Sequence, residues 1–236
     1  MSEYTVKKIA TIYNGFSEKF GIPRQSGLTE AQSVIRFEDS YRNADALRGL
    51  EQYSHLWLVW LFSEFDNEGW SPTVRPPRLG GNKRMGVFAT RSPNRPNPIG
   101  LSVVEIVKIE KSSPYGPQIT VKGADLLNGT PILDIKPYLP YADAYPDALG
   151  GFAQQKLEYA LQVDISAPLL EAIPAEHQTI VLQLLSQDPR PAYQNDPRRI
   201  YTMLYSDISI SFQVEENKLT VVNVRRGTKS EDVSST

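Results

Sequence analysis

Three side chains suited to proton transfer recur at every second residue near the middle of the chain. Asp134, Lys136 and Tyr138 lie in the run ILDIKPYLPYAD, whose alternation predicts a strand. Because alternate residues of a strand face one side, this acid, base and phenol should project together, with Leu133 and Ile135 on the opposite face. A catalytic group is one interpretation. The alternative is a half-exposed strand that carries a Lys–Asp pair.

Positive charge is concentrated between Arg75 and Ser102. This segment contains six basic residues, five prolines, four glycines and no acid, whereas the rest of the chain has 19 basic and 27 acidic residues. Prolines fix the backbone and glycines allow it to approach a ligand closely, so we expect two shaped loops around a short strand, Met85–Thr90. An anionic partner explains the charge. A Pro-rich surface loop with solvated arginines is the alternative.

Two other segments have residues suited to ligand contacts. Pro23, Arg24 and Gln25 combine a fixed turn, a guanidinium and an amide, which together could hold a carboxylate or a base edge. The run SQDPRPAYQNDPRRIYTMLYSD interleaves arginines with tyrosines, a combination suited to phosphate contacts and base stacking in RNA. A loop packed on its own domain is the alternative. The candidate RNA contacts are Arg75, Arg78, Lys83, Arg84, Arg95, Arg190, Tyr193, Arg198 and Arg199.

The scarcity of histidine and cysteine restricts the chemistry. The chain has two histidines and no cysteine, so disulfides, thiolate nucleophiles and Cys-ligated metals are excluded and no paired imidazole ligands can form. His55, in the run SHLWLVWLF, is the one serious candidate for a Ser-His-Asp triad, although a hydrogen-bonded histidine at the mouth of a buried strand is the commoner explanation. We therefore expect catalysis by positioning and electrostatics, without a metal.

Other common classes of protein lack support in the sequence. There is no G-x-G-x-x-G or Walker loop, and no apolar run approaches membrane-spanning length. The first residues contain no apolar signal-peptide region, and the absence of cysteine fits a reducing compartment. We expect a cytoplasmic protein that has no membrane partner.

The elements that must position these residues are mainly β-strands up to Ala144. Many short strands separated by turns, with few helices, predict a β-barrel or sandwich. The run Ser54–Phe65 is apolar almost throughout and should be a central strand buried on both faces. The other expected elements of residues 1–144 are the strands Tyr4–Tyr13, Ser33–Glu38, Ser102–Lys111 and Gln118–Gly123, and a brief helix, Asn43–Gln52.

A second, smaller unit should follow a linker, Tyr145–Phe152. We expect this unit to span residues 152–226 and to be α+β, with a disordered tail at 227–236. Its expected elements are an alternating strand Leu157–Ile165, a helix Pro174–Gln187 with apolar Ile180, Val181, Leu184 and Leu185, and a hairpin of Ile208–Val214 with Leu219–Val224.

Six collinear blocks together resemble the TsaA-like (TrmO) family. The resemblance covers the first unit almost completely and continues into the second, so it is far more specific than any single motif. The blocks are PRQSG from Pro23, ADALRGLEQYSHLWL from Ala44, GW-P-TVRPPRLGGN from Gly69, MGVFATRSPNRPNPIGLS from Met85, DLLNGTPILDIKPYLPYAD from Asp125 and QDPRPAY from Gln187.

The resemblance implies a fold and a reaction. Members of the family are S-adenosylmethionine-dependent tRNA adenine-N6 methyltransferases with a single-sheeted β-barrel; they act as homodimers on threonylcarbamoyl-modified adenosine next to the anticodon. By position, the residues that would bind S-adenosylmethionine are Pro23, Arg24, Gln25, Ser63, Glu64, Arg91, Leu101, Asp125, Leu126, Leu127 and Asn128. The chain departs from the family pattern at Ser63-Glu64, where a histidine and an amide are common, and at Asn128, where aspartate is common.

In such a reaction, Asp134, Lys136 and Tyr138 could take part in proton transfer. The target nitrogen must be held in line with the transferred methyl group and must lose a proton, so Asp134 becomes the candidate acceptor, with Lys136 and Tyr138 orienting it or the substrate. Two alternatives remain: a non-catalytic RNA-binding module of the same fold, and a methyltransferase for a non-RNA acceptor. Cofactor binding tests the first, and salt-dependent tRNA affinity tests the second.

Overall fold

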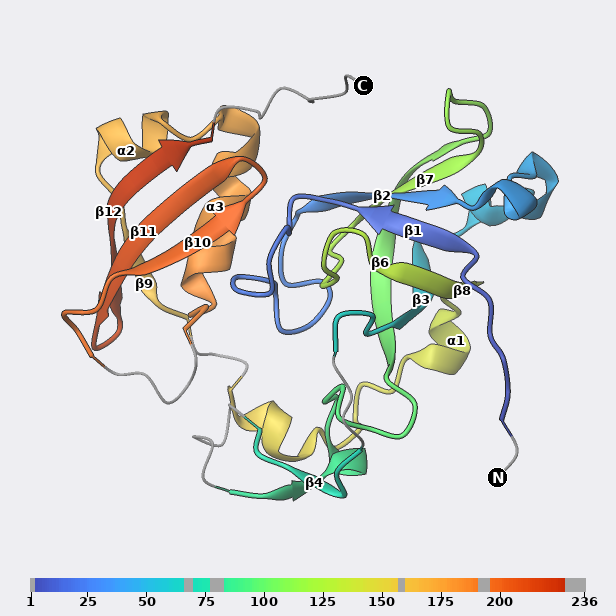
Figure 1. Ribbon diagram of the computed structural model, residues 1–236, viewed down its shortest axis with the longest axis horizontal. Helices are drawn as coiled ribbons and strands as arrows, with labels where there is room; N and C mark the ends of the chain where they lie inside the picture. The colour runs from blue at the N-terminus through green and yellow to red at the C-terminus, as the bar shows by residue number, and fades with distance from the viewer. Residues whose placement is uncertain (1–2, 66–69, 77–82, 157–159, 191–195, 228–236) are drawn as a thin grey trace, which may run out of the picture.

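The first two-thirds of the chain form a closed β-barrel in the computed structural model, which describes residues 3–65, 70–76, 83–156, 160–190 and 196–227 (Figure 1). Six strands close the barrel in the order β1-β2-β7-β6-β3-β8. The prediction of a mainly β chain whose N-terminal part is a single-sheeted barrel is confirmed. The strands are β1 (Ala10–Tyr13), β2 (Gln32–Phe37), β3 (His55–Leu61), β6 (Ile99–Glu110), β7 (Gln118–Lys122) and β8 (Pro131–Pro137).

The run expected to be buried on both faces is buried on one. In β3, Leu56, Leu58 and Trp60 are at most 7% exposed, whereas the residues between them are half-buried. One face of the strand fills the barrel, and the other forms part of its outer wall, so the apolar run does not need a second layer. Leu56 and Leu58 pack there with residues of the other strands, such as Ile12, Ile35 and Ile119.

A bulge changes the expected alternation of β8. Trp60 pairs with Ile132 and Val59 with Asp134, so one residue of β8, Leu133, has no partner across the ladder. Ile132 is therefore fully buried, whereas Leu133, which was expected to share a face with Ile135, is half-buried. Asp134 and Lys136 still share one face, as predicted, because both lie beyond the bulge.

Three shorter elements also differ from expectation. The segment Met85–Thr90 begins as a two-residue strand, β5 (Met85–Gly86), which pairs with β4 (Thr73–Val74). A 3-10 turn, Val87–Ala89, follows this strand. Two 3-10 turns, Ala44–Leu47 and Leu50–Gln52, replace the helix expected at Asn43–Gln52, and a third, Asp39–Tyr41, precedes them. A short helix, α1 (Pro140–Asp143), follows β8, and a 3-10 turn spans Gly151–Lys156.

The C-terminal part is a four-stranded sheet with two helices. The sheet order is β10-β11-β12-β9, and α3 packs its buried Val181, Leu184 and Leu185 into the same core (Figure 1). This agrees with the predicted α+β fold, although β10 lies in a run read as a loop and residues 157–159 of the first expected strand are outside the described range. The elements are β9 (Gln162–Asp164), α2 (Ala167–Glu171), α3 (Ala175–Ser186), β10 (Tyr201–Tyr205), β11 (Ile208–Glu215) and β12 (Lys218–Arg226).

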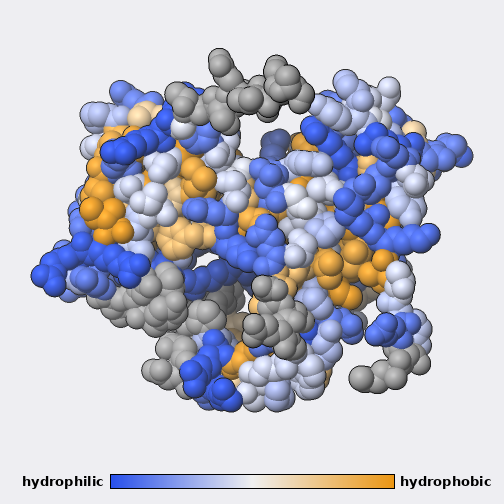
Figure 2. All heavy atoms as spheres, in the orientation of Figure 1, coloured by the Kyte–Doolittle hydropathy of each residue, from blue (hydrophilic) through white to orange (hydrophobic). Residues whose placement is uncertain are grey.

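Hydrophobic residues reach the surface in separate patches rather than in one continuous band on the face shown in Figure 2. No helix in the described part of the chain is both long and apolar enough to cross a membrane. Of the expected tail, only Gly227 belongs to the described residues.

Gly100 gives a direct test of the barrel packing. It pairs with Trp60 across β6 and β3, and a Cβ added to it would lie 2.2 Å from the indole. We expect Gly100→Ala to lower the free energy of unfolding by about 1–3 kcal/mol, because the indole must move inside a packed core. Gly86→Ala, where a Cβ meets nothing within 4 Å, should change it by less than about 0.5 kcal/mol in the same urea titration. Equal effects of the two substitutions would contradict the packing described.

Candidate functional site

The long loop between β1 and β2, residues 14–31, joins the two parts of the molecule. Phe16 and Ala31 are 1% and 0% exposed and belong to the hydrophobic core of the C-terminal part, against which Phe20 and Ile22 also pack. The ring of Phe16 meets Tyr205 edge-on at a centroid distance of 5.3 Å. The barrel thus contributes part of the C-terminal core, an arrangement the sequence did not predict.

Hydrogen bonds hold the same loop along both of its sides. Toward the C-terminal part, Leu204 N donates to Glu18 Oε1 at 3.0 Å and Ser206 N to the Gly15 carbonyl at 2.7 Å. Toward the barrel, Gly27 N donates to the Gly123 carbonyl at 2.8 Å. Residues 23–25, expected to bind the cofactor, are therefore fixed between the two parts, where the loop lies in Figure 1.

Arg24 connects this loop to the C-terminal QDPRPAY segment. Its Nη2 donates to the carbonyls of Asp188 and Arg190, at 3.0 and 3.1 Å. Arg190, a candidate RNA contact, is 7% exposed and forms a two-armed ion pair with Asp188, at 2.8 and 2.9 Å. In this position the Arg190 guanidinium stabilises the turn and does not project from the surface.

Gln25, Arg91 and Asp125 come together although they are far apart in sequence. Arg91 Nη1 donates to Gln25 Oε1 at 2.5 Å, and the charge of Arg91 acts on Asp125. Burial raises the pKa of the Asp125 carboxyl, while hydrogen bonds from the Ser102 hydroxyl and the Ser26 backbone oppose that rise. We call Gln25, Arg91, Ser102 and Asp125 the polar cluster.

The polar cluster is supported from inside the barrel. Ser102 Oγ donates to Asp125 Oδ1 at 2.6 Å and accepts from Trp60 Nε1 at 3.0 Å. Ser102 is 1% exposed, so this chain of two hydrogen bonds links the barrel core to the cluster at its mouth. Sequence reasoning missed Ser102 and Trp60, although a serine that alternates with Gly100 and Val104 on the inward face of β6 was a usable signal.

Removal of the Ser102 hydroxyl should be costly. Ser102→Ala leaves the buried indole N–H of Trp60 without its acceptor, so we expect the free energy of unfolding to fall by about 1–3 kcal/mol. In a Trp60→Phe background no donor is orphaned, and the same change should cost clearly less. A double-mutant cycle by urea denaturation measures the difference. Equal costs in the two backgrounds would show that the hydrogen bond does not stabilise the fold.

The remaining residues expected at the cofactor site surround the same loop. Lys19 Nζ donates to the Glu64 carbonyl at 2.7 Å, which ties the exposed Ser63-Glu64 turn to the β1–β2 loop. Asn128 Oδ1 accepts from Asn14 N at 3.0 Å, and the Leu126 carbonyl accepts from Asn14 Nδ2 at 2.9 Å. Leu126 is 0% exposed and belongs to the barrel core. Pro23 is buried, Leu127 is half-buried, and Leu101 is 51% exposed.

The expected catalytic residues lie on the outer face of the barrel. Lys136 Nζ is 2.8 Å from Asp134 Oδ2, and the two side chains are 66% and 46% exposed, as expected for a surface Lys–Asp pair. Tyr138 packs against the ring of Trp57, at a centroid distance of 5.9 Å. Asp134 pairs with Val59, which in turn pairs with Leu101, so Asp134 and Leu101 lie on one face two strands apart, about 10 Å.

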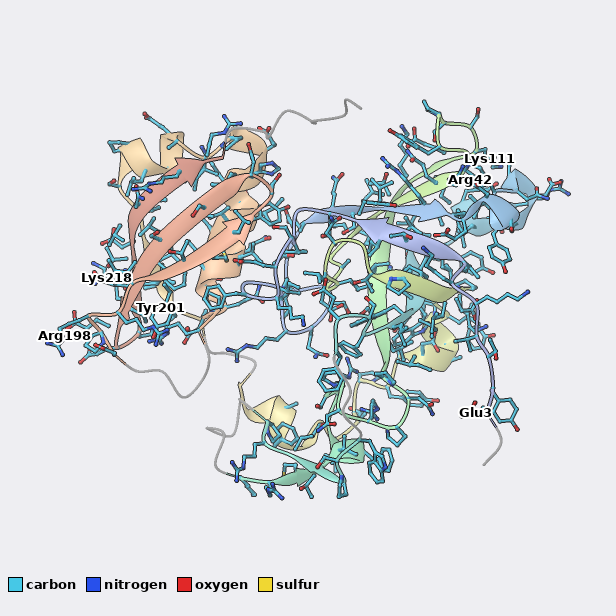
Figure 3. The ribbon with its side chains drawn as sticks, in the orientation of Figure 1. Glu3, Arg42, Lys111, Arg198, Tyr201 and Lys218 are labelled. Atoms are coloured by element: carbon cyan, nitrogen blue, oxygen red, sulfur yellow. The ribbon has the colours of Figure 1, made fainter. Side chains whose placement is uncertain are left out.

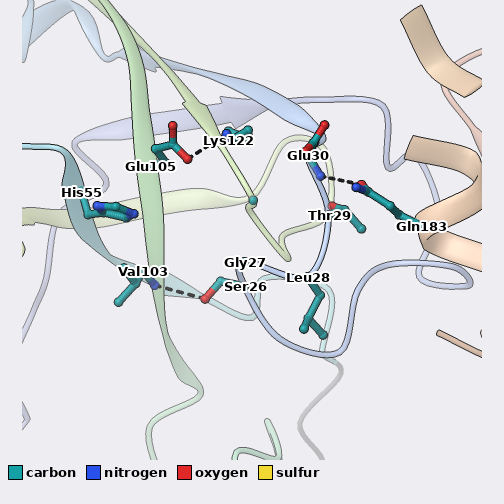
Figure 4. A pocket seen from close by; sticks show the side chains of 11 residues that line it. Ser26, Gly27, Leu28, Thr29, Glu30, His55, Val103, Glu105, Lys122 and Gln183 are labelled. Atoms are coloured by element: carbon teal, nitrogen blue, oxygen red, sulfur yellow. Dashed lines mark hydrogen bonds and ion pairs between the residues drawn. The ribbon is translucent and has the colours of Figure 1, made fainter. Parts of the chain in front are cut away.

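A cavity of about 500 Å³ opens beside this region, between the β1–β2 loop, the barrel wall and α3 (Figure 4). Its lining is mainly polar and includes Glu105 and Lys122, which are 2.8 Å apart. The hydrogen bond from Lys122 lowers the pKa of Glu105. None of the residues expected to bind the cofactor lines this cavity, so we place the candidate site at the polar cluster instead.

His55 lines the cavity at the start of β3. Its Nδ1 is 2.8 Å from Ser54 Oγ, its neighbour in sequence, and its ring lies 6.1 Å from that of Tyr138. The acid opposite it in the sheet, Glu105, is paired with Lys122. Of the two interpretations, a hydrogen-bonded histidine at the start of a strand fits these contacts.

The basic residues divide between two surfaces. Arg75, Lys83 and Arg84 are exposed on the β4–β5 hairpin, and Arg95 is half-buried in the loop that follows. Arg198 projects from the end of the C-terminal sheet that is far from the barrel in Figure 3, and its side chain is 93% exposed. Arg199 lies over the ring of Tyr201 at 5.2 Å. Arg78 and Tyr193 lie outside the described residues. No group of three His, Cys, Asp or Glu that could hold a metal ion occurs in the described ranges.

Both parts of the molecule are similar to known proteins. The family model for the tRNA-methyltransferase O N-terminal domain matches residues 11–144, and that for the TrmO C-terminal domain matches residues 154–227. The tRNA (adenine(37)-N6)-methyltransferase of Escherichia coli K12 is 40% identical over 227 residues, which cover 92% of the chain and 95% of the relative.

Two further matches come from Pseudomonas aeruginosa. The protein named putative S-adenosylmethionine-dependent methyltransferase RcsF is 42% identical over 218 residues, 88% of the chain and 91% of the relative. A crystal structure of TrmO superposes with a TM-score of 0.77 and 34% sequence identity, and the match covers 96% of the chain and 99% of that structure.

Proposed function

Since the chain belongs to the tRNA-methyltransferase O family, we propose that it is an S-adenosylmethionine-dependent tRNA methyltransferase acting on N6 of adenosine 37. The observation that carries the proposal is the convergence of Gln25, Arg91 and Asp125 at the mouth of the barrel, in a chain similar over 92% of its length to an enzyme named for that reaction. The likeness extends over both parts of the molecule.

The polar cluster fits the chemistry of the cofactor. S-adenosylmethionine supplies a methyl group to the reaction, and it carries a carboxylate, an adenine edge and a cationic sulfur that the site must accommodate. Arg91 is exposed and oriented by Gln25, which suits a guanidinium that binds a carboxylate. Arg24 and Arg95 are engaged with backbone carbonyls. The exposed side chain of Leu101 offers an apolar surface, and Glu64 offers an exposed anion.

Replacement of Arg91 tests this assignment. We expect Arg91→Ala to weaken cofactor binding by about 10- to 100-fold, the usual range for loss of a charge-assisted hydrogen bond. Isothermal titration with S-adenosylmethionine in the absence of tRNA measures the change. Arg48→Ala is the matched control, because Arg48 is also exposed and pairs with Asp45 on the surface away from the cluster. Unchanged affinity of the Arg91 variant would remove Arg91 from the proposed site.

On the acceptor side, we propose that Asp134 takes the proton that N6 loses and that Lys136 holds the Asp134 carboxylate in place. Support comes from their 2.8 Å ion pair and from the shared outer face of Asp134 and Leu101. Catalysis is then mainly positioning of a poor nucleophile, aided by one acceptor. The other proposed cofactor contacts are Pro23, Arg24, Ser63, Leu126, Leu127 and Asn128.

Three finer features of the function are also proposals. The substrate adenosine carries a threonylcarbamoyl group, the enzyme is a homodimer, and it works in the cytoplasm. For the dimer, support comes from the exposed apolar side chains Tyr141, Tyr145 and Leu149, at 87%, 75% and 95%, because such residues in one segment are typical of an interface. Light scattering should give twice the chain mass of 26.5 kDa; a value equal to one chain would exclude the dimer.

The function is tested by transfer of labelled methyl from S-adenosylmethionine to total tRNA from a strain that lacks this gene. We expect nucleoside mass spectrometry to identify N6-methylated threonylcarbamoyladenosine as the product. tRNA that lacks the threonylcarbamoyl group is the control, and efficient methylation of it would contradict the proposed requirement for that group. Cofactor binding without any incorporation into tRNA would point to a non-RNA acceptor instead.

A further inference from the structure

Two aromatic side chains stand exposed beside the candidate site. Trp70 is 50% exposed and Phe88 is 72% exposed, although large apolar side chains are normally buried. Their rings lie with centroids 6.4 Å apart and planes inclined by 23°, so they are nearly parallel. We call Trp70 and Phe88 the ring pair.

The surroundings of the ring pair are basic. The guanidinium of Arg95 lies 5.9 Å from the centre of the Phe88 ring, within the range of a cation–π contact. The hairpin between the two aromatic residues exposes Arg75, Lys83 and Arg84. No acidic residue occurs between Arg75 and Ser102. An apolar ring pair among cations is complementary to a partner that is both flat and anionic.

The segment that carries Phe88 is held rigidly next to the polar cluster. Arg95 Nη1 donates to the Thr90 carbonyl at 2.9 Å, and Thr90 Oγ1 donates to the Val87 carbonyl at 2.8 Å. Phe88 is three residues from Arg91, so their Cα atoms are at most about 11 Å apart. A ligand stacked on Phe88 would therefore lie within one or two nucleotides of a base presented to the polar cluster.

We propose that the ring pair stacks an unpaired base of the tRNA anticodon loop next to the base that is methylated, while Arg75, Lys83 and Arg84 contact the flanking phosphates. This inference rests on the proposed function and adds to it the means by which the enzyme grips its substrate. Every nucleobase has a π-face, and aromatic stacking between phosphate-binding cations is how proteins commonly hold single-stranded RNA. A partner protein with an apolar surface would match the rings but leave the cations uncompensated.

The test is tRNA binding by ring-pair variants. Phe88→Leu and Trp70→Leu keep an apolar side chain but remove the ring, and we expect each to weaken tRNA affinity about 5- to 100-fold in filter-binding assays. Phe88→Tyr and Trp70→Phe keep a ring and should restore most of the affinity. Since stacking releases no counterions, the salt dependence of binding should keep its slope in the leucine variants, whereas Arg84→Ala should reduce it by about one.

Tyr115→Ala is the matched control, because Tyr115 is also a half-exposed aromatic residue beside an arginine, but it lies outside the basic segment Arg75–Ser102. Tyr115 is 50% exposed, and the guanidinium carbon of Arg36 lies 3.8 Å from the centre of its ring. It should bind tRNA like the parent protein. Cofactor affinity, measured without tRNA, should be unchanged in the leucine variants, which shows that the loop is intact.

The outcomes separate the two proposals. If the parent protein methylates tRNA and the leucine variants bind tRNA equally well, the ring pair has no stacking role, and the proposed function stands. If the leucine and ring-retaining variants lose affinity alike, the loss is not due to stacking and the inference is wrong. If the parent protein itself shows no methyl transfer to tRNA, the proposed function fails.

Discussion

The Asp134→Asn variant is expected to transfer methyl groups about 10²- to 10⁴-fold more slowly than the parent enzyme, the range typical of a lost general base. N6 of adenine loses a proton as it gains the methyl group, and an amide cannot accept that proton. Asparagine has nearly the same shape and can still accept the hydrogen bond from Ile135 N, at 2.9 Å in the parent. Single-turnover rates at saturating cofactor should fall, with tRNA affinity unchanged.

A matched carboxylate elsewhere on the barrel provides the control. Glu110 pairs with Lys108, two residues away on one strand, at 2.9 Å, just as Asp134 pairs with Lys136. Glu110→Gln should leave the rate within about twofold of the parent, since a surface ion pair contributes little to stability. Full activity of Asp134→Asn would show that Asp134 is only a surface partner of Lys136, and the acceptor would have to be sought elsewhere.

The Phe16→Ala variant should lose about 3–5 kcal/mol of unfolding free energy, because it leaves a cavity in a closed core. Phe16 is 1% exposed and meets Tyr205 edge-on at 5.3 Å, so the cavity opens where the barrel loop enters the C-terminal part. Release of that loop should also weaken cofactor binding, since residues 23–25 depend on its position. Guanidinium titration and isothermal calorimetry measure the two effects.

Two spectroscopic probes can show which part of the Phe16→Ala variant is destabilised. All three tryptophans of the chain lie between residues 57 and 70, so their fluorescence follows the barrel, while far-UV circular dichroism also follows the C-terminal part. The two transitions should coincide in the parent and separate in Phe16→Ala. Phe16→Leu, which nearly fills the cavity, should cost less than about 1.5 kcal/mol. Coincident, unshifted transitions in the alanine variant would mean that the two parts do not share a core.

The local sequence pattern was sufficient to predict most of the secondary structure. The turn-delimited strands predicted a β-barrel or sandwich, and the family resemblance chose the barrel. The helix expected at Pro174–Gln187 is present as Ala175–Ser186. Sequence could not distinguish a strand buried on two faces from one that lines a barrel, because β3 has apolar residues on both faces. The bulge at Leu133 also could not be predicted from the sequence, because it depends on how β8 pairs with β3.

The site was less predictable, because its contacts join residues that are distant in sequence. The resemblance to the family pointed to residues 23–25, Arg91 and Asp125, but nothing in the residues alone shows that Arg91 reaches Gln25, 66 positions away. The charge pattern gave no sign that the guanidinium of Arg190 forms an ion pair with Asp188. Sequence composition cannot distinguish an arginine that stabilises a turn from one that binds a phosphate.

The joining of the two parts by the β1–β2 loop has a consequence for synthesis of the protein. Glu18 accepts a hydrogen bond from Leu204, 186 residues later, so the loop cannot reach its final position until the last strands leave the ribosome. At about 5–20 residues per second, translation of that interval takes roughly 10–40 s. Throughout this delay the β1–β2 loop, which carries the proposed cofactor contacts Pro23, Arg24 and Gln25, lacks its hydrogen bonds to the C-terminal part. Prematurely terminated chains should therefore neither bind the methyl donor nor compete with complete enzyme for it.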